Sequence, residues 1–327
     1  LKGPQADAMV APRQAILLAI GLLPGQDDEQ LLREALRDEQ RDIRRAAALA
    51  VAIQVLHDHR PGWANAPERM LRALKSERVK MHLEDGAEAV FARGILAAQG
   101  LATPEWDELF SLAQKPSTEE EAARAAAQCL LFCESPGFHD RILRSVQEGV
   151  DLKPTVLAAF LLLLGTDATA EGVEVCRQYL SNKGLRPKAK PEWDVRYFAA
   201  VGLLRALAAG RLSEGELRAK VLSTLDVGLK KGLQPGPFRD ALAEVMDNER
   251  RQLAEDPYYT LPETRVASVE AAFHDPHGLF AKDVRDMAVV RLNDMVPVVF
   301  NVNQLKPGQP GDRDKSEIPR RFLKACQ

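Results

Sequence analysis

The sequence predicts an all-α protein built from repeated helical pairs. Hydrophobic residues make up 46% of the 327 residues and aromatic residues only 6%. Alanine and leucine dominate the apolar set, which suits closely packed helices, whereas a sheet protein would be richer in Val, Ile, Tyr and Thr. One helix opening also occurs twice, at 42–49 and at 194–201: an acid, a β-branched apolar residue, Arg, two variable residues and two small residues. A signature that recurs at a long spacing indicates stacked helical repeats.

Composition also limits the function classes. Charged residues are 28% of the chain and the net charge is −3, which is typical of a folded chain and disfavours non-specific nucleic-acid binding. Four cysteines are too few for a disulfide framework, and Cys129 and Cys133, four residues apart on one expected helix, are expected to be buried free thiols. The longest apolar run, 155–165, is about half the length of a membrane-spanning helix, so no span is predicted.

The clearest repeat unit runs from Asp27 to His57. Apolar residues recur at helical spacing in 31–36, a short polar break follows at 38–42, and a second periodic stretch fills 43–56. The acidic run 27–29 is favourable at the positive N-terminus of the first helix. This unit predicts two antiparallel helices joined by about four residues.

Weaker copies of the pair follow along the chain. Their second helices are expected to begin near Asp85, Glu121, Lys153 and Asp194, which gives a mean spacing of about 38 residues counted from Asp42. Ser117-x-x-Glu120 is also predicted to form a capping box. The expected pairs are 66–75 with 86–99, 104–114 with 119–133, 138–148 with 154–164, 173–180 with 193–208, and 213–230 with 238–253.

The first unit resembles a HEAT repeat across nearly its full length. The residues that carry the resemblance are Leu31-x-x-x-Ala35-Leu36-x-Asp38-x-x-x-x-Ile43-Arg44-x-x-Ala47-x-x-Ala50. Asp194-Val195-Arg196-x-x-Ala199-Ala200 is similar to the second half of such a repeat, whereas the middle copies lack the arginine. The resemblance covers about residues 5–250. It implies an α-solenoid of about six antiparallel helical pairs over 1–255, in which each pair buries its apolar stripe by stacking on its neighbours.

Residues 256–327 have a different composition and are expected to form a less regular C-terminal extension. Loop-like stretches at 256–259 and 274–277 precede an expected helix at 280–295, and 297–302 has the residue types of a strand. The extension is interpreted as a cap of the array or as a partner-binding tail. Its apolar residues 298–300 either dock on the last helices or pair with another chain by strand addition.

Two helix positions are candidates for binding. Arg44 and Arg196 occupy the same repeat position and are expected to be tied to acidic residues, with Asp38 or Asp42 as partners of Arg44; a row of ligand-contacting arginines is the alternative. Arg45 and Tyr197 come one residue later and are expected to face solvent on the concave side. Arg and Tyr are favoured at binding hot spots, so both are predicted partner contacts.

A basic loop is the second candidate region. Residues 182–190 carry four positive charges and no negative one, on Lys183, Arg186, Lys188 and Lys190. The loop could bind an acidic partner, phosphate or nucleic acid, and the alternative is that it only keeps the protein soluble.

No catalytic motif stands out. A phosphate-binding glycine loop, His-Glu-x-x-His and Gly-x-Ser-x-Gly are all absent from the sequence. His57 and His59 diverge on a helix, and 274–277 offers two histidines and one aspartate without a fourth ligand. We therefore expect no catalytic residue, no metal and no cofactor.

The sequence predicts a non-enzymatic scaffold that binds a protein partner on the concave face of the array. Nucleic acid is a disfavoured partner, and no oligomeric state is predicted. Two alternatives stay open: a nucleic-acid-binding HEAT array, and a HEAT-like enzyme or lyase that handles a small cofactor.

Overall fold

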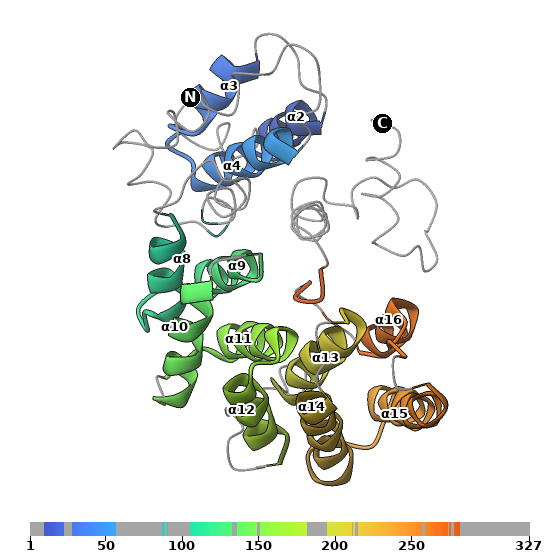
Figure 1. Cartoon of the computed structure of the whole chain (residues 1–327). Coiled ribbons are helices and arrows are strands. Elements are labelled where there is room, and N and C mark those ends of the chain that lie inside the picture. Colours follow the sequence, from blue (N-terminus) through green and yellow to red (C-terminus); the bar gives the residue numbers. More distant parts are fainter. Residues whose placement is uncertain are drawn as a thin grey trace. The chain divides into compact units, whose positions relative to one another are not determined.

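In the computed structural model most of the described residues lie in helices. The described residues are 10–22, 28–56, 87, 90, 105–132, 136–148, 151–181, 195–210, 212, 215–256, 259–273, 275 and 278–281. None of them lies in a strand (Figure 1). They confirm the all-α fold class. The chain divides into two compact units, which are described separately below: unit 1 is Leu1–Phe132 with Ala281–Gln327, and unit 2 is Cys133–Phe280.

Unit 1 contains the first and third of the predicted pairs. The helices of the first pair, α3 and α4, pack together, as do α8 and α9, and α2 packs against α4. The second expected pair, 66–75 with 86–99, lies outside the described residues except for Ala87 and Val90, which are buried. The described helices of the unit are α2 (Val10–Leu22), α3 (Asp28–Ala35), α4 (Arg41–Leu56), α8 (Glu105–Gln114) and α9 (Glu120–Leu130).

Helix α9 begins without the predicted capping box. Its N-cap residue is Glu119, and no side chain caps the helix by a hydrogen bond. The prediction of Ser117 as the N-cap is therefore wrong by two residues. The acidic residues Glu120 and Glu121 in the first turn complement the positive end of the helix dipole instead.

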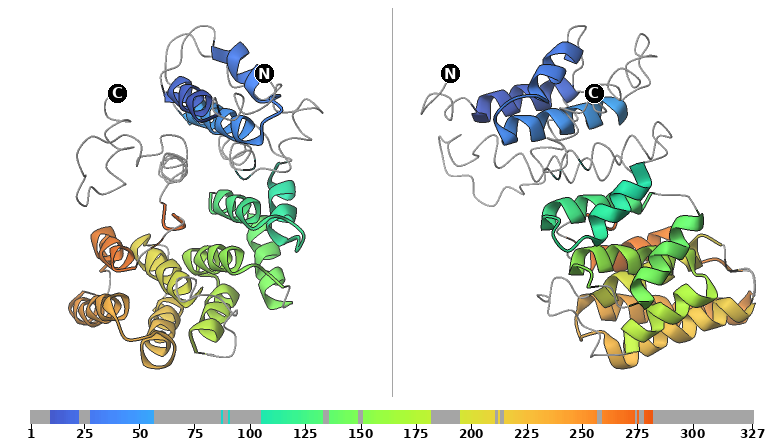
Figure 2. Two further views of the ribbon diagram at one scale, coloured as in Figure 1. Left: turned by 180° about the vertical axis from the view of Figure 1, so that it is seen from behind. Right: turned by 90° about the vertical axis from the view of Figure 1, so that its left-hand side faces the viewer.

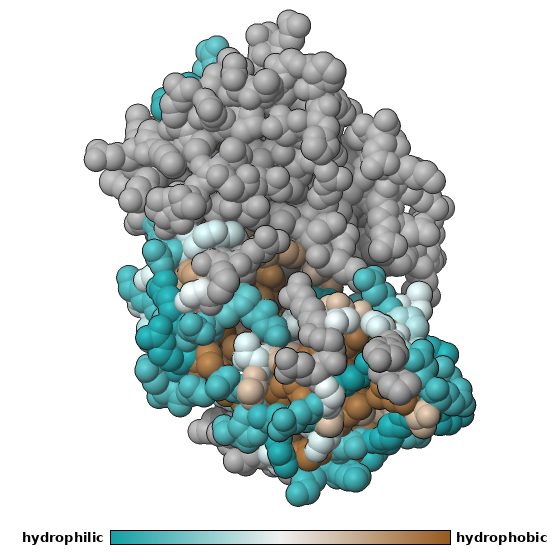
Figure 3. All heavy atoms as spheres, viewed as in Figure 1, coloured by the Kyte–Doolittle hydropathy of each residue, from teal (hydrophilic) through white to brown (hydrophobic). Residues whose placement is uncertain are grey.

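Unit 2 contains the fourth and fifth predicted pairs and extends beyond them. Its helices are α10 (Pro136–Gln147), α11 (Pro154–Asp167), α12 (Ala170–Ser181), α13 (Val195–Ala208), α14 (Gly215–Val227), the π-helix η3 (Gly228–Gly232), α15 (Pro237–Glu255) and α16 (Glu263–Ala271). Helix α12 packs against α10 and α14, whereas α13 packs against α11 and α16 (Figures 1 and 2). Hydrophobic residues lie between these helices and hydrophilic residues line their outer rim on the face shown in Figure 3.

Helix α16 was not among the expected elements. It lies in the segment assigned to the C-terminal extension, yet it packs against α13 and α15 within the same compact unit. Its apolar residues Val266 and Val269 are buried. The expected helix at 280–295 and the strand-like segment at 297–302 lie outside the described residues, apart from 280 and 281.

Backbones approach closely where α11 crosses α13. A Cβ added to Gly165 would lie 2.9 Å from the backbone nitrogen of Leu203, and one added to Gly202 would overlap the carbonyl oxygen of Leu162. Helix α11 is buried along its apolar run, Thr155 to Gly165. No described helix is long and apolar enough to cross a membrane.

The same kind of contact occurs in unit 1, where a Cβ on Gly21 of α2 would lie 2.7 Å from the Cα of Ala50 in α4. Ala50 follows Asp42 by eight residues, and Gly202 follows Asp194 by eight residues. Directly after each copy of the repeated signature, a small residue therefore lies where the helix meets a glycine of an earlier helix. Close backbone approach explains why the residue at this position is small.

Candidate functional site

The two repeat-position arginines bind backbone carbonyls inside the chain. Nη1 of Arg44 donates to the carbonyl oxygens of Asp38 at 2.8 Å and Glu39 at 2.9 Å. The side chain of Arg196 is 1% exposed, and its Nη1 donates to the carbonyl oxygen of Gly232. The expected carboxylate partner of Arg44 is corrected accordingly, because the Asp38 carboxylate pairs with Arg13. Both arginines therefore make internal contacts: Arg44 binds the turn before α4, and Arg196 joins α13 to the end of η3.

Arg45 belongs to a group of ion pairs that links α4 to α9. Its guanidinium lies 3.9 Å from the carboxylate of Asp42 and 3.3 Å from that of Glu121, while Arg41 lies 2.6 Å from Glu119. The acids are about half exposed, with side-chain exposures of 51–54%. Exposed pairs of this kind contribute about 0–1 kcal/mol each. A partner carboxylate could therefore displace them at small cost.

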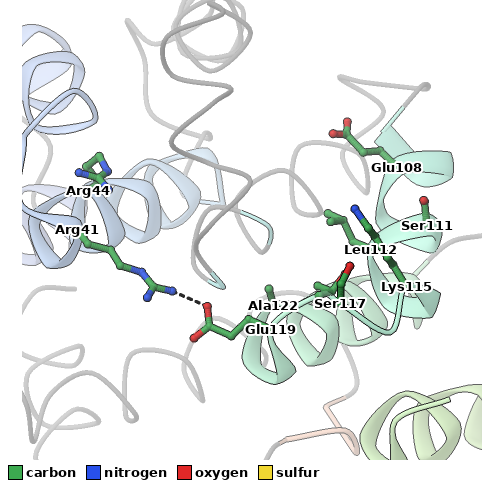
Figure 4. Close-up of a pocket in the computed structure, with 10 residues that line it drawn as sticks. Arg41, Arg44, Glu108, Ser111, Leu112, Lys115, Ser117, Glu119 and Ala122 are labelled. Carbon is green, nitrogen blue, oxygen red and sulfur yellow. Dashed lines mark hydrogen bonds and ion pairs between the residues drawn. The ribbon is translucent and has the colours of Figure 1, made fainter. Parts of the chain in front are cut away.

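The Arg41–Glu119 pair lines a cleft of about 690 Å³ between α4 and the α8–α9 pair, which we call the polar cleft (Figure 4). The predicted contact residue Arg45 is not among the residues that line it. Its lining holds three cations, two carboxylates and three hydroxyl groups. In Figure 4 the side chain of Arg41 reaches across to Glu119, and Glu108, Ser111 and Lys115 lie along α8. The lining residues are Arg41, Arg44, Lys115, Glu108, Glu119, Ser111, Ser117, Thr118, Leu112 and Ala122.

The chemistry of the polar cleft suits a charged, hydrogen-bonding ligand. Its volume lies within the usual range of ligand sites, about 300–1,000 Å³, but such sites are mostly apolar. Charges of both signs and hydroxyl groups instead match the groups that a polypeptide segment presents. Lys115 and Glu108 were not predicted, because nothing local in the sequence indicates that they lie near Arg41, more than 60 positions away.

Tyr197 packs against aromatic side chains of unit 2. Its ring stacks on Phe273 with centroids 4.8 Å apart and meets Phe238 edge-on at 4.6 Å. Phe198 and Phe280 complete the cluster. The expectation that Tyr197 projects into solvent is corrected: its side chain is half-buried because residues of α15 and of the segment after α16 cover it. Its role in partner binding stays a prediction.

The remaining candidate side chains from the sequence lie outside the described residues. They are the basic-loop residues Lys183, Arg186, Lys188 and Lys190 and the histidines His57, His59, His274 and His277. Within the described part of the chain, no three His, Cys, Asp or Glu side chains group together as metal ligands.

Cys129 is a buried free thiol, as predicted, and so is Cys176. Cys133, for which the same was predicted, lies outside the described residues. The Sγ of Cys176 donates to the carbonyl oxygen of Leu161 at 3.8 Å. Burial raises the pKa of this thiol to about 12. It therefore stays protonated near neutral pH and is a poor nucleophile, because the thiolate is the reactive form.

Comparison with known proteins finds no protein-family model that matches the chain and no curated protein that matches it.

Proposed function

We propose that the chain is a HEAT-like α-solenoid of about six helical pairs that serves as a non-enzymatic scaffold and binds a protein partner in the polar cleft. The polar cleft is the observation that carries this proposal. It is open, lined by both signs of charge, and bordered by weak ion pairs that a partner can replace.

The repeated close contacts support the stacked architecture. Gly21 with Ala50 and Gly165 with Gly202 place the two copies of the signature in the same register against an earlier helix. In unit 2 the contacts of α12 with α10 and α14, and of α13 with α11 and α16, are those expected of two stacked layers. Such arrays present long surfaces on which one helix per repeat can contact a partner.

The test compares capture by full-length wild type, Lys115→Glu and a control, Arg251→Glu. Lys115 lines the polar cleft, whereas Arg251 is an exposed residue of α15 in unit 2. Each protein is coupled to beads, incubated with extract of the source organism, and the bound proteins are quantified by mass spectrometry.

We expect at least one protein to be retained by wild type and Arg251→Glu and reduced about tenfold on Lys115→Glu, since one charge reversal at a contact costs about 1–2 kcal/mol. Equal capture by all three proteins would refute the polar cleft as the binding site. No specific capture by any of them would refute the scaffold function. The two alternatives from the sequence, a nucleic-acid-binding array and a HEAT-like enzyme or lyase, stay predictions.

A further inference from the structure

Most cations in unit 2 are held by partners within the protein. Arg205 pairs with Glu270 at 2.8 Å, Arg218 pairs with Glu249 at 2.6 Å, and Arg250 pairs with Asp226. Arg239 and Lys220 donate to backbone carbonyls. Internal pairing is therefore the ordinary state of a basic side chain in this unit.

Three cations depart from this pattern. Among the described residues, the side chains of Arg177, Lys230 and Lys231 make no hydrogen bond, ion pair or ring contact, and all three residues are exposed. Glu174, one turn before Arg177 on α12, forms no ion pair with it. The three charges are thus available to groups outside the chain.

The three cations come from two elements that touch. Helix α12 packs against η3, and a Cβ added to Gly232 would overlap the carbonyl oxygen of Leu180. One added to Gly228 would lie 3.0 Å from the Leu180 side chain. Arg177 precedes Leu180 by three residues, and Lys230 and Lys231 lie between the two glycines. We call these three residues the cationic surface.

Helix dipoles explain only part of this charge. α12 ends at Ser181 and η3 ends at Gly232, and basic residues are commonly found at such ends because each C-terminus carries about −0.5 charge. Two ends supply about −1 against three cations. The buried Arg196 guanidinium already binds the carbonyl of Gly232. A surplus of positive charge remains at the surface.

We propose that the cationic surface docks an acidic segment of a protein partner, a short run rich in Asp or Glu. Three cations can form ion pairs with the few carboxylates of a short acidic segment. Duplex DNA instead requires a long stripe, with about 6–10 phosphate contacts for strong binding, and the net charge of the chain is −3. The sequence after Ser181 carries four more positive charges and no negative one up to Lys190, although those residues lie outside the described part and are not counted in the site.

This inference goes beyond the proposed function, because the cationic surface belongs to unit 2 and the polar cleft to unit 1. Reversing Lys115 tests the cleft and leaves the cationic surface intact. The two proposals can therefore fail separately.

The experiment measures the fluorescence anisotropy of a fluorescein-labelled peptide of four Glu-Glu-Ser repeats with the full-length protein at 50 and 200 mM NaCl. The same peptide with Gln in place of Glu, and a labelled 12-base-pair duplex, are measured in parallel. The variants are the double variant Lys230→Glu, Lys231→Glu and a control double variant of equal charge change, Arg251→Glu, Arg265→Glu. The control residues are exposed on α15 and α16, and Arg265 lies 3.6 Å from the carboxylate of Glu244. Melting temperatures confirm that every variant folds.

We expect the Glu peptide to bind wild type and the control, to bind more weakly at 200 mM NaCl, and to lose about tenfold in affinity for the Lys230, Lys231 variant. The Gln peptide should not bind. Equal affinity for the Glu peptide in both double variants, or no binding to wild type, would overturn the proposal. Tighter binding of the duplex than of the Glu peptide, lost in the Lys230, Lys231 variant, would also overturn it and assign the surface to nucleic acid.

Discussion

Replacing Gly202 by alanine tests the close crossing of α11 and α13. Alanine normally stabilises a helix interior by about 0.5–1 kcal/mol relative to glycine. Here the new Cβ would overlap the carbonyl oxygen of Leu162 and lie 3.0 Å from the Cα of Gly165 and 3.1 Å from the nitrogen of Thr166. Carbon atoms in ordinary contact are about 3.5–4.0 Å apart. Because these three neighbours are all backbone atoms, no side chain can rotate away, and α11 and α13 must separate.

The cost follows from the two opposing terms. Overpacking of a well-packed core costs about 1–3 kcal/mol, and the backbone contacts place Gly202→Ala at the upper end. Subtracting the helix-propensity gain leaves a net loss of about 2 kcal/mol in the free energy of unfolding. For a unit of this size the melting temperature should fall by about 4–8 °C.

The assay is thermal and urea unfolding followed by circular dichroism at 222 nm, with Gly137→Ala as the matched control. Gly137 lies in α10, and a Cβ added there meets nothing within 4 Å. The control should match wild type or gain stability by less than about 1 kcal/mol. If Gly202→Ala is as stable as wild type or more stable while the control behaves as expected, the register of α11 against α13 is wrong.

Three further predictions concern buried groups. Ala47→Asp places a charge at a position that is 0% exposed, so α4 should lose helicity in circular dichroism spectra, and an unchanged melting temperature would contradict its placement. Arg218→Ala leaves the buried Glu249 carboxylate (1% exposed) without its ion pair, which should cost about 3–5 kcal/mol in urea unfolding, and Arg218→Met with Glu249→Leu should recover most of the loss. The folded-state pKa of Cys176 is raised from about 9 to about 12, so its contribution to stability is complete below pH 9 and is lost as the pH rises towards 12. Between pH 8 and pH 10.5 the urea midpoint should therefore fall more for wild type than for Cys176→Ala, and equal falls would show that the thiol is not buried.

Most of the described helices could be predicted from the sequence because their signals are local, but α2 and α16 were not among the expected elements. The 3.6-residue spacing of apolar residues predicted α3, α4 and α8 to α15. These are the expected helices that fall within the described residues. The capping-box prediction was wrong because Ser117 and Glu120 match the sequence pattern, but α9 begins after Glu119 and no side chain caps it. Helix α16 was missed because its buried face consists of only Val266 and Val269, which makes its apolar period weak.

The candidate site could be predicted only in part. Arg45 forms ion pairs with Asp42 and Glu121 but does not line the polar cleft, and Lys115 and Glu108 carry no local pattern that places them opposite α4. The four charged residues of the basic loop lie outside the described part of the chain. In the sequence, nothing marks Lys230 and Lys231 as more than basic residues near a helix end. They differ from the other cations of unit 2 because their side chains have no partner among the described residues.

The sequence by itself determined where helices form and which positions had to be small, because periodicity and the repeated Asp-x-Arg signature act within one helix. Only the tertiary structure decided what those helices meet. Tyr197 lies under Phe273, Arg196 reaches Gly232 and Gly202 touches Gly165, and each of these contacts joins residues more than 30 positions apart. Contacts at such separations depend on how the helices stack, and that is why the sequence located the small residues of the signature without revealing which charges would be left exposed for a partner.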